Sequence, residues 1–278
     1  MNSKIYKALR NYGETKLNPC LNISPGASGE ASGACVNRSL GGSAQPGFYW
    51  GACLSNRPTS WDTNIRQING ISVEQGTEHN QRIGDYIWLK KTHCTFQLDM
   101  VPTQNANHGL IQFRLLVVKA REAVTPAGLV YAPQASLFIQ NSGQSNGYLS
   151  VASGTPPNNV TPMNEFQVQN MPINKRNWVV FRDQRFVLSS PQTVANEPAG
   201  VNDLYFSSKY PTRKNFVLNL NHFKKTKYQE IAGSNQNYPL NYDPKYLVMI
   251  FAQPIGSNTR PAGNWQVNMT GVTSYTDS

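Results

Sequence analysis

The apolar residues of this chain recur at every second position rather than at the spacing of about 3.6 residues that an amphipathic helix needs. The pattern is clearest near the C-terminus, where Trp265, Val267 and Met269 alternate with polar residues. Such alternation is typical of a strand with one buried face and one polar face. No repeat of roughly 20 to 50 residues runs through the sequence, which argues against a propeller or a solenoid. The pattern predicts an all-β fold.

Seven or eight strands can be counted, separated by loops of very unequal length. They are expected at Ile83–Val101, Leu110–Lys119, Ser136–Gln140, near Phe166, at Asn177–Ser189 with a bulge at Arg182–Gln184, and at Phe216–Leu220, Tyr246–Ala252 and Asn264–Tyr275. A chain of 278 residues can be one large β domain, and a single jelly-roll β-sandwich of two antiparallel sheets accommodates this count best.

The N-terminal part has a different composition. Ser3–Tyr12 predicts a short basic helix, and Asn18–Gly47 is rich in Gly, Ser, Ala and Pro, which is typical of an extended connector. We therefore divide the chain into a helix and flexible arm at 1–47 and a jelly-roll domain at 48–278. The arm is expected to be ordered only by neighbouring subunits.

A long insertion, rich in Pro, Gly, Asn and Ser, is expected within the domain at about 122–171. Because a sandwich cannot bury so much polar backbone, we expect this insertion on the outer surface or at symmetry contacts. On this interpretation, replacing Ser142–Pro156 with a short linker spares the fold.

The chain has 25 Lys and Arg against 15 Asp and Glu, and the excess is local. Ten basic and three acidic residues lie between Lys175 and Lys227, which accounts for +7 of the net charge of +10. This segment is either a surface that binds phosphates or a solvated face that keeps the protein soluble. The nucleic-acid-binding candidates are Arg213, Lys214, Lys224, Lys225 and Lys227, with a second, weaker basic element at Lys4, Lys7, Arg10 and Lys16.

The residue patterns of common enzymes are missing. The four histidines are widely separated, and no GxSxG, GxxxxGK[ST], GxGxxG or HExxH motif occurs. Neither the histidines nor the four cysteines have the spacing of a metal site. Lone acids such as Asp99 and Asp183 are best interpreted as ion-pair, cap or turn residues. The sequence thus predicts a non-enzymatic protein that has no catalytic residues and needs no metal or cofactor.

No apolar run approaches the roughly 20 residues that a membrane helix needs, and the N-terminus lacks the apolar core of a secretory signal. The chain is therefore expected to fold inside a cell without inserting into a membrane.

One segment resembles a known family. The stretch from Gln75 to Lys91 resembles the segment that opens the jelly roll in capsid proteins of circular, Rep-encoding single-stranded DNA viruses, the circovirus-like group. A second, shorter similarity is WVVFRDQRFVLS at Trp178–Ser189, with Asp183 as its central acidic residue. The residues that carry the first motif, which we also expect near subunit contacts, are Gln75, Gly76, Thr77, Gln81, Arg82, Ile83 and Gly84.

The resemblance implies a coat protein that self-assembles into an icosahedral shell and packages single-stranded DNA. Its expected partners are further copies of the chain, single-stranded nucleic acid and an unknown host receptor. Its expected locations are the virion and, during assembly, the nucleus or cytoplasm of the host cell. Two alternatives stay open: a carbohydrate-binding, lectin-like jelly roll, favoured by the aromatic content and the polar uncharged loops, and an enzyme of an unrecognised kind.

Overall fold

The structure is a computed structural model. It describes residues 15–23, 37–39, 46–55, 57–58, 61–62, 65–67, 71, 73–77, 79, 81–100, 110–121, 132–139, 145–148, 160–163, 165–189, 192–196, 201–205, 209–229, 238–239, 245–255 and 265–277. The predicted helix at Ser3–Tyr12, with Lys4, Lys7 and Arg10, lies outside the described residues.

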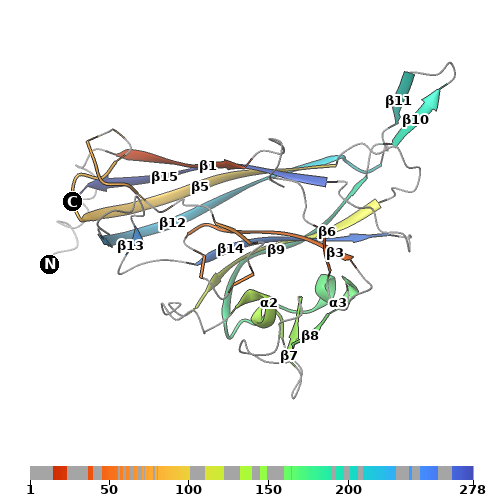
Figure 1. Ribbon diagram of the computed structural model, residues 1–278, viewed down its shortest axis with the longest axis horizontal. Helices are drawn as coiled ribbons and strands as arrows, with labels where there is room; N and C mark the ends of the chain where they lie inside the picture. The colour runs from red at the N-terminus through yellow and green to blue at the C-terminus, as the bar shows by residue number, and fades with distance from the viewer. Residues whose placement is uncertain are drawn as a thin grey trace.

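Eight main strands form two antiparallel layers that pack face to face (Figure 1). The first sheet has the order β1 (Lys16–Ile23), β15 (Trp265–Asp277), β5 (Tyr86–Met100) and β12 (Arg213–Gln229), with the short β13 (Tyr238–Pro239) beside the end of β12. The second has the order β3 (Pro46–Cys53), β14 (Tyr246–Pro254), β6 (Leu110–Ala120) and β9 (Trp178–Ser189), with the short β2 (Asn37–Ser39) and β4 (Ile65–Gln67) paired to β3.

The order of these strands confirms the predicted jelly roll. Each of the eight main strands is followed by a strand of the other sheet, except that β6 is followed by its neighbour β9. Parallel sheets would need crossover helices, whereas here the pairs among the eight main strands are all antiparallel. The jelly roll is such a double-sheet arrangement.

The core between the sheets follows the predicted alternation. On β5, Cys94, Phe96 and Leu98 point inward and are fully buried, and they pack with Phe113 and Leu115 of β6. Burying each large apolar side chain contributes about 1.5 to 3 kcal/mol relative to leaving it exposed. From Lys91 to Asp99 the outward residues of β5 are polar. The face of the first sheet that points away from the second sheet is here called the outer face.

The N-terminal boundary of the sandwich differs from the prediction. Lys16–Ile23, which the composition assigns to the arm, is the edge strand β1 and pairs with β15 from Lys16↔Tyr275 to Ile23↔Met269. Pro19 obscures this strand in the sequence, but an edge strand tolerates a proline because one side of its backbone has no partner. The Gln75–Gly84 motif also does not open the jelly roll: it precedes β5, after β1 and β3.

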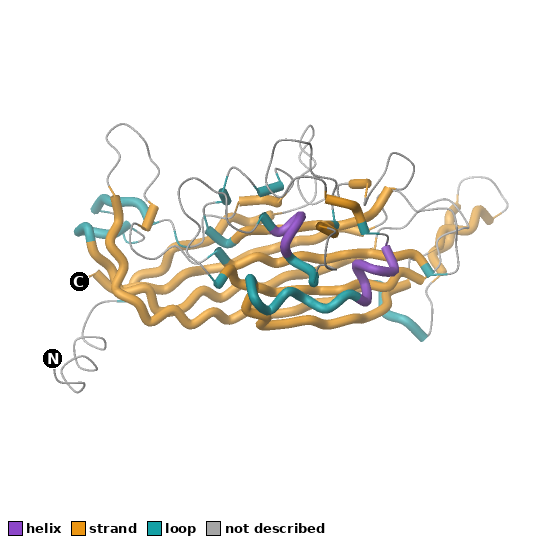
Figure 2. Tube along the Cα trace, turned by 90° about the horizontal axis from the view of Figure 1, so that it is seen from below, coloured by secondary structure: helices purple, strands orange, loops and turns teal. Residues whose placement is uncertain are grey.

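The long insertion builds a second core on the far side of the second sheet. It contains α2 (Pro133–Ser136), β7 (Ser145–Gly147), β8 (Val160–Pro162) and α3 (Glu165–Asn170), and Figure 2 shows both helices in front of the strands. Its buried residues pack on Tyr49, Leu116 and Phe251 of the sheet, and they include Leu137, Phe138, Tyr148, Met163 and Val168.

Two expectations for this insertion are therefore wrong. Its described part is not all surface, because Tyr148, inside the segment Ser142–Pro156, is fully buried. The strands expected at Ser136–Gln140 and near Phe166 are replaced by α2 with a single bridge at Phe138, and by α3. Short apolar runs do not distinguish a strand from a turn of helix by periodicity alone, and Pro133 at the start of α2 favours a helix.

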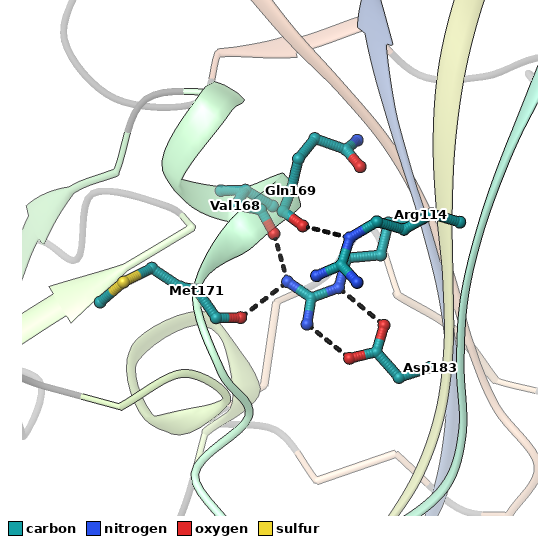
Figure 3. A network of polar contacts seen from close by, with 6 residues as sticks. Arg114, Val168, Gln169, Met171 and Asp183 are labelled. Atoms are coloured by element: carbon teal, nitrogen blue, oxygen red, sulfur yellow. Dashed lines mark hydrogen bonds and ion pairs between the residues drawn. The ribbon is translucent and has the colours of Figure 1, made fainter.

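A buried arginine holds α3 against the second sheet (Figure 3). Arg114 of β6 donates two hydrogen bonds to Asp183 of β9, at 2.9 and 2.6 Å, and two more to the backbone oxygens of Val168 and Met171, at 2.6 and 2.8 Å. Its guanidinium group also lies over the ring of Phe138, 5.5 Å from the centroid. The ion-pair interpretation of Asp183 is thus confirmed, and this carboxylate fastens the insertion to the sandwich.

A two-stranded ribbon, β10 (Gln192–Asn196) and β11 (Val201–Tyr205), projects from one end of the sandwich (Figure 1). At the opposite end, the first residue of β1 lies beside the last residues of β15. In the described part of the chain, no helix has the length and apolar character to span a membrane.

Candidate nucleic-acid interface

Strand alternation sends the basic residues of β12 to two different faces. Arg213, Lys225 and Lys227 lie opposite Asp99, Trp88 and Tyr86 of β5 on the outer face. Lys214 and Lys224 lie opposite the buried Leu98 and Leu89, so they point toward the second sheet. The five predicted residues therefore follow one strand but do not share one face.

Arg213 lies far from the three C-terminal lysines of β12. Twelve residues of extended strand separate it from Lys225, which corresponds to about 40 Å. Its guanidinium group forms an ion pair with Asp99 at 2.5 Å, and the side chains of Gln97 and Asn268 also donate hydrogen bonds to that carboxylate. The ion-pair interpretation of Asp99 is thus confirmed.

The two outward lysines converge on one aromatic ring. The ammonium nitrogens of Lys225 and Lys227 lie 4.9 and 5.6 Å from the ring centroid of Tyr86, which is 39% exposed. Trp88 is the strand partner of Lys225 on the same face. We call Tyr86, Trp88, Lys225 and Lys227 the outer cluster. Ammonium groups bind phosphates and exposed rings stack on bases, so this combination suits single-stranded nucleic acid.

A bulge separates the outer cluster from the rest of the strand. His222 and Phe223 of β12 lie opposite the single residue Lys90 of β5, because the register shifts between Asn221 and Lys224. Phe223 has φ of 47°, in the left-handed region, which costs a non-glycine residue roughly 1 to 2 kcal/mol. Its ring is 51% exposed. Bulges re-aim side chains, and this one turns an aromatic ring to the surface beside the lysines.

A second group of residues lies between the two sheets at the same bulge. The ring of Tyr246 on β14 contacts Phe181 of β9 at 5.5 Å between centroids, and His222 of β12 at 5.9 Å. The ammonium group of Lys119 on β6 lies 5.5 Å from the centre of the same ring. We call Lys119, Phe181, His222, Lys224 and Tyr246 the inner cluster.

Burial and like charge act on the titratable groups of the inner cluster. Burial lowers the pKa of Lys119, and the charge of Lys224 lowers it further. Burial lowers the pKa of His222 to about 4, and the charge of Lys119 adds to the effect. The Nε2 atom of His222 lies 2.8 Å from the hydroxyl of Thr92, which in turn lies 2.8 Å from the hydroxyl of Thr273. The imidazole is therefore neutral at physiological pH, between two lysines.

This burial predicts an acid-sensitive stability. Below about pH 6.5 the unfolded chain protonates His222, whereas the folded protein resists until about pH 4, so the free energy of unfolding falls across that range and levels off below it. The expected loss is on the order of 3 kcal/mol. Chemical denaturation at a series of pH values would measure it. The variant His222→Gln should flatten the slope. Equal slopes in wild type and His222→Gln would contradict the prediction.

Lys16, the described member of the weaker basic element, joins three segments at one end of the sandwich. Its ammonium group forms an ion pair with Asp277 at 2.7 Å and donates a hydrogen bond to the backbone oxygen of Gln81 at 2.9 Å. Its side chain is only 10% exposed. The structure thus gives Lys16 a role within its own subunit, joining β1, β15 and the loop before β5.

The Gln75–Gly84 motif folds onto itself at the same end of the sandwich. The backbone N–H of Gly76 donates a hydrogen bond to the backbone oxygen of Arg82, and a Cβ atom at position 76 would displace the end of the Gln81 side chain. Arg82 is fully buried, donates to the backbone oxygens of Val73 and Gly84, and lies 5.1 Å from the ring centre of Tyr228.

The remaining motif residues differ in exposure. Gln75, Thr77 and Ile83 are exposed, and Ile83 is the most exposed of the large apolar side chains described. That these three residues contact a neighbouring subunit stays a prediction. Arg82, by contrast, supports the loop from within its own chain.

The aromatic and basic partners of the lysines are not predicted from the sequence. Tyr86 lies within the predicted strand Ile83–Val101, but its register opposite Lys227 is a property of pairing across the sheet. Lys119 ends an apolar run and Phe181 lies in a bulge, so neither has a local signal for a binding surface. Among the described residues, no group of three or more His, Cys, Asp or Glu side chains could hold a metal ion.

No protein-family model and no curated protein matches this sequence. The candidate interface therefore rests on its geometry alone. A competing explanation exists for its charges, because β12 and β9 are edge strands and lysines on an edge discourage pairing with other chains. A nucleic-acid interface predicts that the lysines bind phosphates, whereas protection of the strand edges predicts no such binding.

Proposed function

We propose that this chain is a viral coat protein that assembles into a closed shell and packages single-stranded DNA. The observation that carries the proposal is the convergence of Lys225 and Lys227 on the exposed ring of Tyr86. Lysines alone are enough to keep an edge strand from pairing with another chain, and that role needs no exposed aromatic ring between them. The jelly roll and the motif similar to circovirus-like capsid proteins support the same function, as does the local excess of positive charge.

The proposal extends to the assembly and its location. Shells of identical jelly rolls need contacts between copies, and the exposed Gln75, Thr77 and Ile83 supply one candidate surface. The partners are then other copies of the chain and single-stranded DNA, with a host receptor on the particle surface. The protein acts in the virion and, before assembly, in the nucleus or cytoplasm of the infected cell.

A salt titration tests the DNA contact. Each phosphate that a lysine engages contributes a log–log salt slope of about −0.7 for a single strand, so Lys225→Gln/Lys227→Gln should flatten the slope for an oligo(dT) by about 1.4. Base identity should matter little, because stacking on an aromatic ring is tolerant of sequence. The fold should keep its melting temperature, since solvated charges contribute only about 0 to 1 kcal/mol each.

The matched control is Lys175→Gln/Arg176→Gln, which removes the same charge from two exposed residues before β9. It should leave the slope nearly as in wild type. If both double variants flatten the salt slope equally, net charge alone governs the binding of oligo(dT). Electron microscopy of the purified protein with and without oligo(dT) tests assembly, and protein that stays monomeric under all salt and pH conditions would refute the shell.

A second candidate function is carbohydrate binding, which the outer face favours. Carboxamide side chains gather there, and Trp88 and Tyr86 lie at one end of the same face. Amides and flat aromatic rings are the groups that bind neutral sugars. Such binding would be insensitive to salt and would be lost in Trp88→Ala. The carboxamide residues are Gln97, Asn215, Asn219, Asn221, Gln266 and Asn268.

A further inference from the structure

The inner cluster lies along the side of the sandwich where both sheets end, and we call this side the opening. β12 and β9 are the last long strands of their sheets on this side, and Lys214 of β12 lies over the ring of Phe186 on β9 at 5.8 Å. Further along, His222 of β12 contacts Tyr246 of the second sheet. Side chains from both sheets therefore meet along this side between Lys214 and His222 of β12.

The opening is positively charged. The segment of β12 contains no acid, and the only acid of β9, Asp183, points to the opposite face of its sheet, where Arg114 holds it. Arg182 lies opposite the core residue Val117, so it points into the opening with Lys119, Lys214 and Lys224. Cations from both sheets thus border the opening.

An aromatic platform accompanies this charge. Phe181 is 51% exposed, although one side of its ring is supported by the buried Tyr246 at an interplanar angle of 49°. The register of β9 against β6 shifts at this point, between Val117 and Val118, so Phe181 is the extra residue of a bulge. A ring that is fixed on one side and open on the other is suited to stacking a planar group.

We propose that Lys119, Lys224 and Phe181 form a nucleotide site between the two sheets, with the lysines on a phosphate and the phenyl ring on the base. This inference rests on the proposed function and adds a second, sheet-bridging contact to the outer cluster. An acidic peptide would satisfy the lysines but would leave the ring without a planar partner, so the observations favour a nucleotide of the packaged strand.

The site has a physical consequence for the subunit. A nucleotide bound there touches β6 and β9 of one sheet and β12 of the other, so it holds the open side of the sandwich together. A ligand that binds only the folded protein raises its stability by mass action. Oligo(dT) should therefore raise the melting temperature of the wild-type protein in proportion to the logarithm of its concentration.

The test compares binding of oligo(dT) to four variants in the full chain. Phe181→Ala should weaken binding roughly 5- to 150-fold, the factor that about 1 to 3 kcal/mol per stacked base corresponds to, with an unchanged salt slope. Lys119→Gln should flatten the slope by about 0.7. Phe181→Tyr keeps the ring and should bind as wild type does. Phe166→Ala removes the exposed phenyl ring of α3 and should also bind as wild type does.

The outcomes separate this site from the proposed function. Wild-type affinity and slope in both Phe181→Ala and Lys119→Gln would overturn the nucleotide site, while particle formation and the effect of Lys225→Gln/Lys227→Gln would still support the coat protein. Displacement of oligo(dT) by polyglutamate at equal charge concentration would show that the surface binds any polyanion. That result would also overturn the nucleotide site. Protein that neither assembles nor binds oligo(dT) would refute the proposed function itself. Thermal melts of each variant confirm that it is folded.

Discussion

Replacing Tyr148 with alanine is expected to lower the free energy of unfolding by about 3 to 5 kcal/mol, the range for deleting a large buried aromatic side chain. Tyr148 is fully buried, and its ring lies 5.2 Å from that of Tyr49 and 5.4 Å from that of Phe251. The cavity left behind would lie between the insertion and the second sheet. Denaturant titration of the purified protein measures this loss.

The variant Tyr148→Phe is the control and should be neutral or slightly stabilising. Within the described part of the chain, the buried hydroxyl of Tyr148 has no hydrogen-bond partner, and burial of this kind raises its pKa well above the usual value. Removing an unpaired buried hydroxyl avoids its desolvation cost. If Tyr148→Ala unfolds at the wild-type denaturant concentration, the insertion contributes no core and the original surface expectation is correct after all.

Replacing Asp183 with leucine should cost about 3 to 5 kcal/mol, because it leaves the buried guanidinium charge of Arg114 without its carboxylate. The hydrogen bonds to Val168 and Met171 keep the arginine in place, so it cannot simply turn to solvent. The expected structural effect is a loosening of α3 and of the second core. Hydrogen exchange of the backbone amides in α3 would report that loosening directly.

The matched control is Arg213→Leu, which breaks an ion pair at the surface. Arg213 is 61% exposed, and Asp99 keeps its hydrogen bonds from Gln97 and Asn268. Its loss should cost no more than about 1 kcal/mol. Similar losses in Asp183→Leu and Arg213→Leu would mean that the two ion pairs contribute alike and that burial of Arg114 does not matter.

The sequence predicts where the central strands lie, but not the edge strand and the helices that pack beside them. β5, β6, β14 and β15 have apolar residues at every second position or in a continuous run, and their predicted limits are close to those observed. β1 is not predicted, because Pro19 and the polar residues of this strand interrupt the alternation of apolar and polar residues. The helices of the insertion were mistaken for strands because their burial depends on a surface that the second sheet supplies, which local patterns do not show.

The sequence shows which strand carries the basic residues of the candidate site, but not to which face of the sheet each residue points. The run of lysines on β12 is visible in the sequence, yet whether Lys224 and Lys225 point together or apart depends on alternation and on the bulge at Phe223. The rings of Tyr86 and Phe181 come from strands that are distant in sequence. No local pattern could have joined them to the lysines, because those contacts exist only after the two sheets have formed.

The pairing of β1 with β15 has a consequence for the order of folding. Lys16 lies opposite Tyr275, so β1 is synthesised long before its partner strand β15. Contacts between distant parts of a chain slow folding, and unpaired strand edges favour aggregation in the meantime. A proline in the middle of β1 makes that waiting edge a poor template for other chains. Synthesis of β15, rather than the appearance of β1, is then the event that allows β1 to join the first sheet.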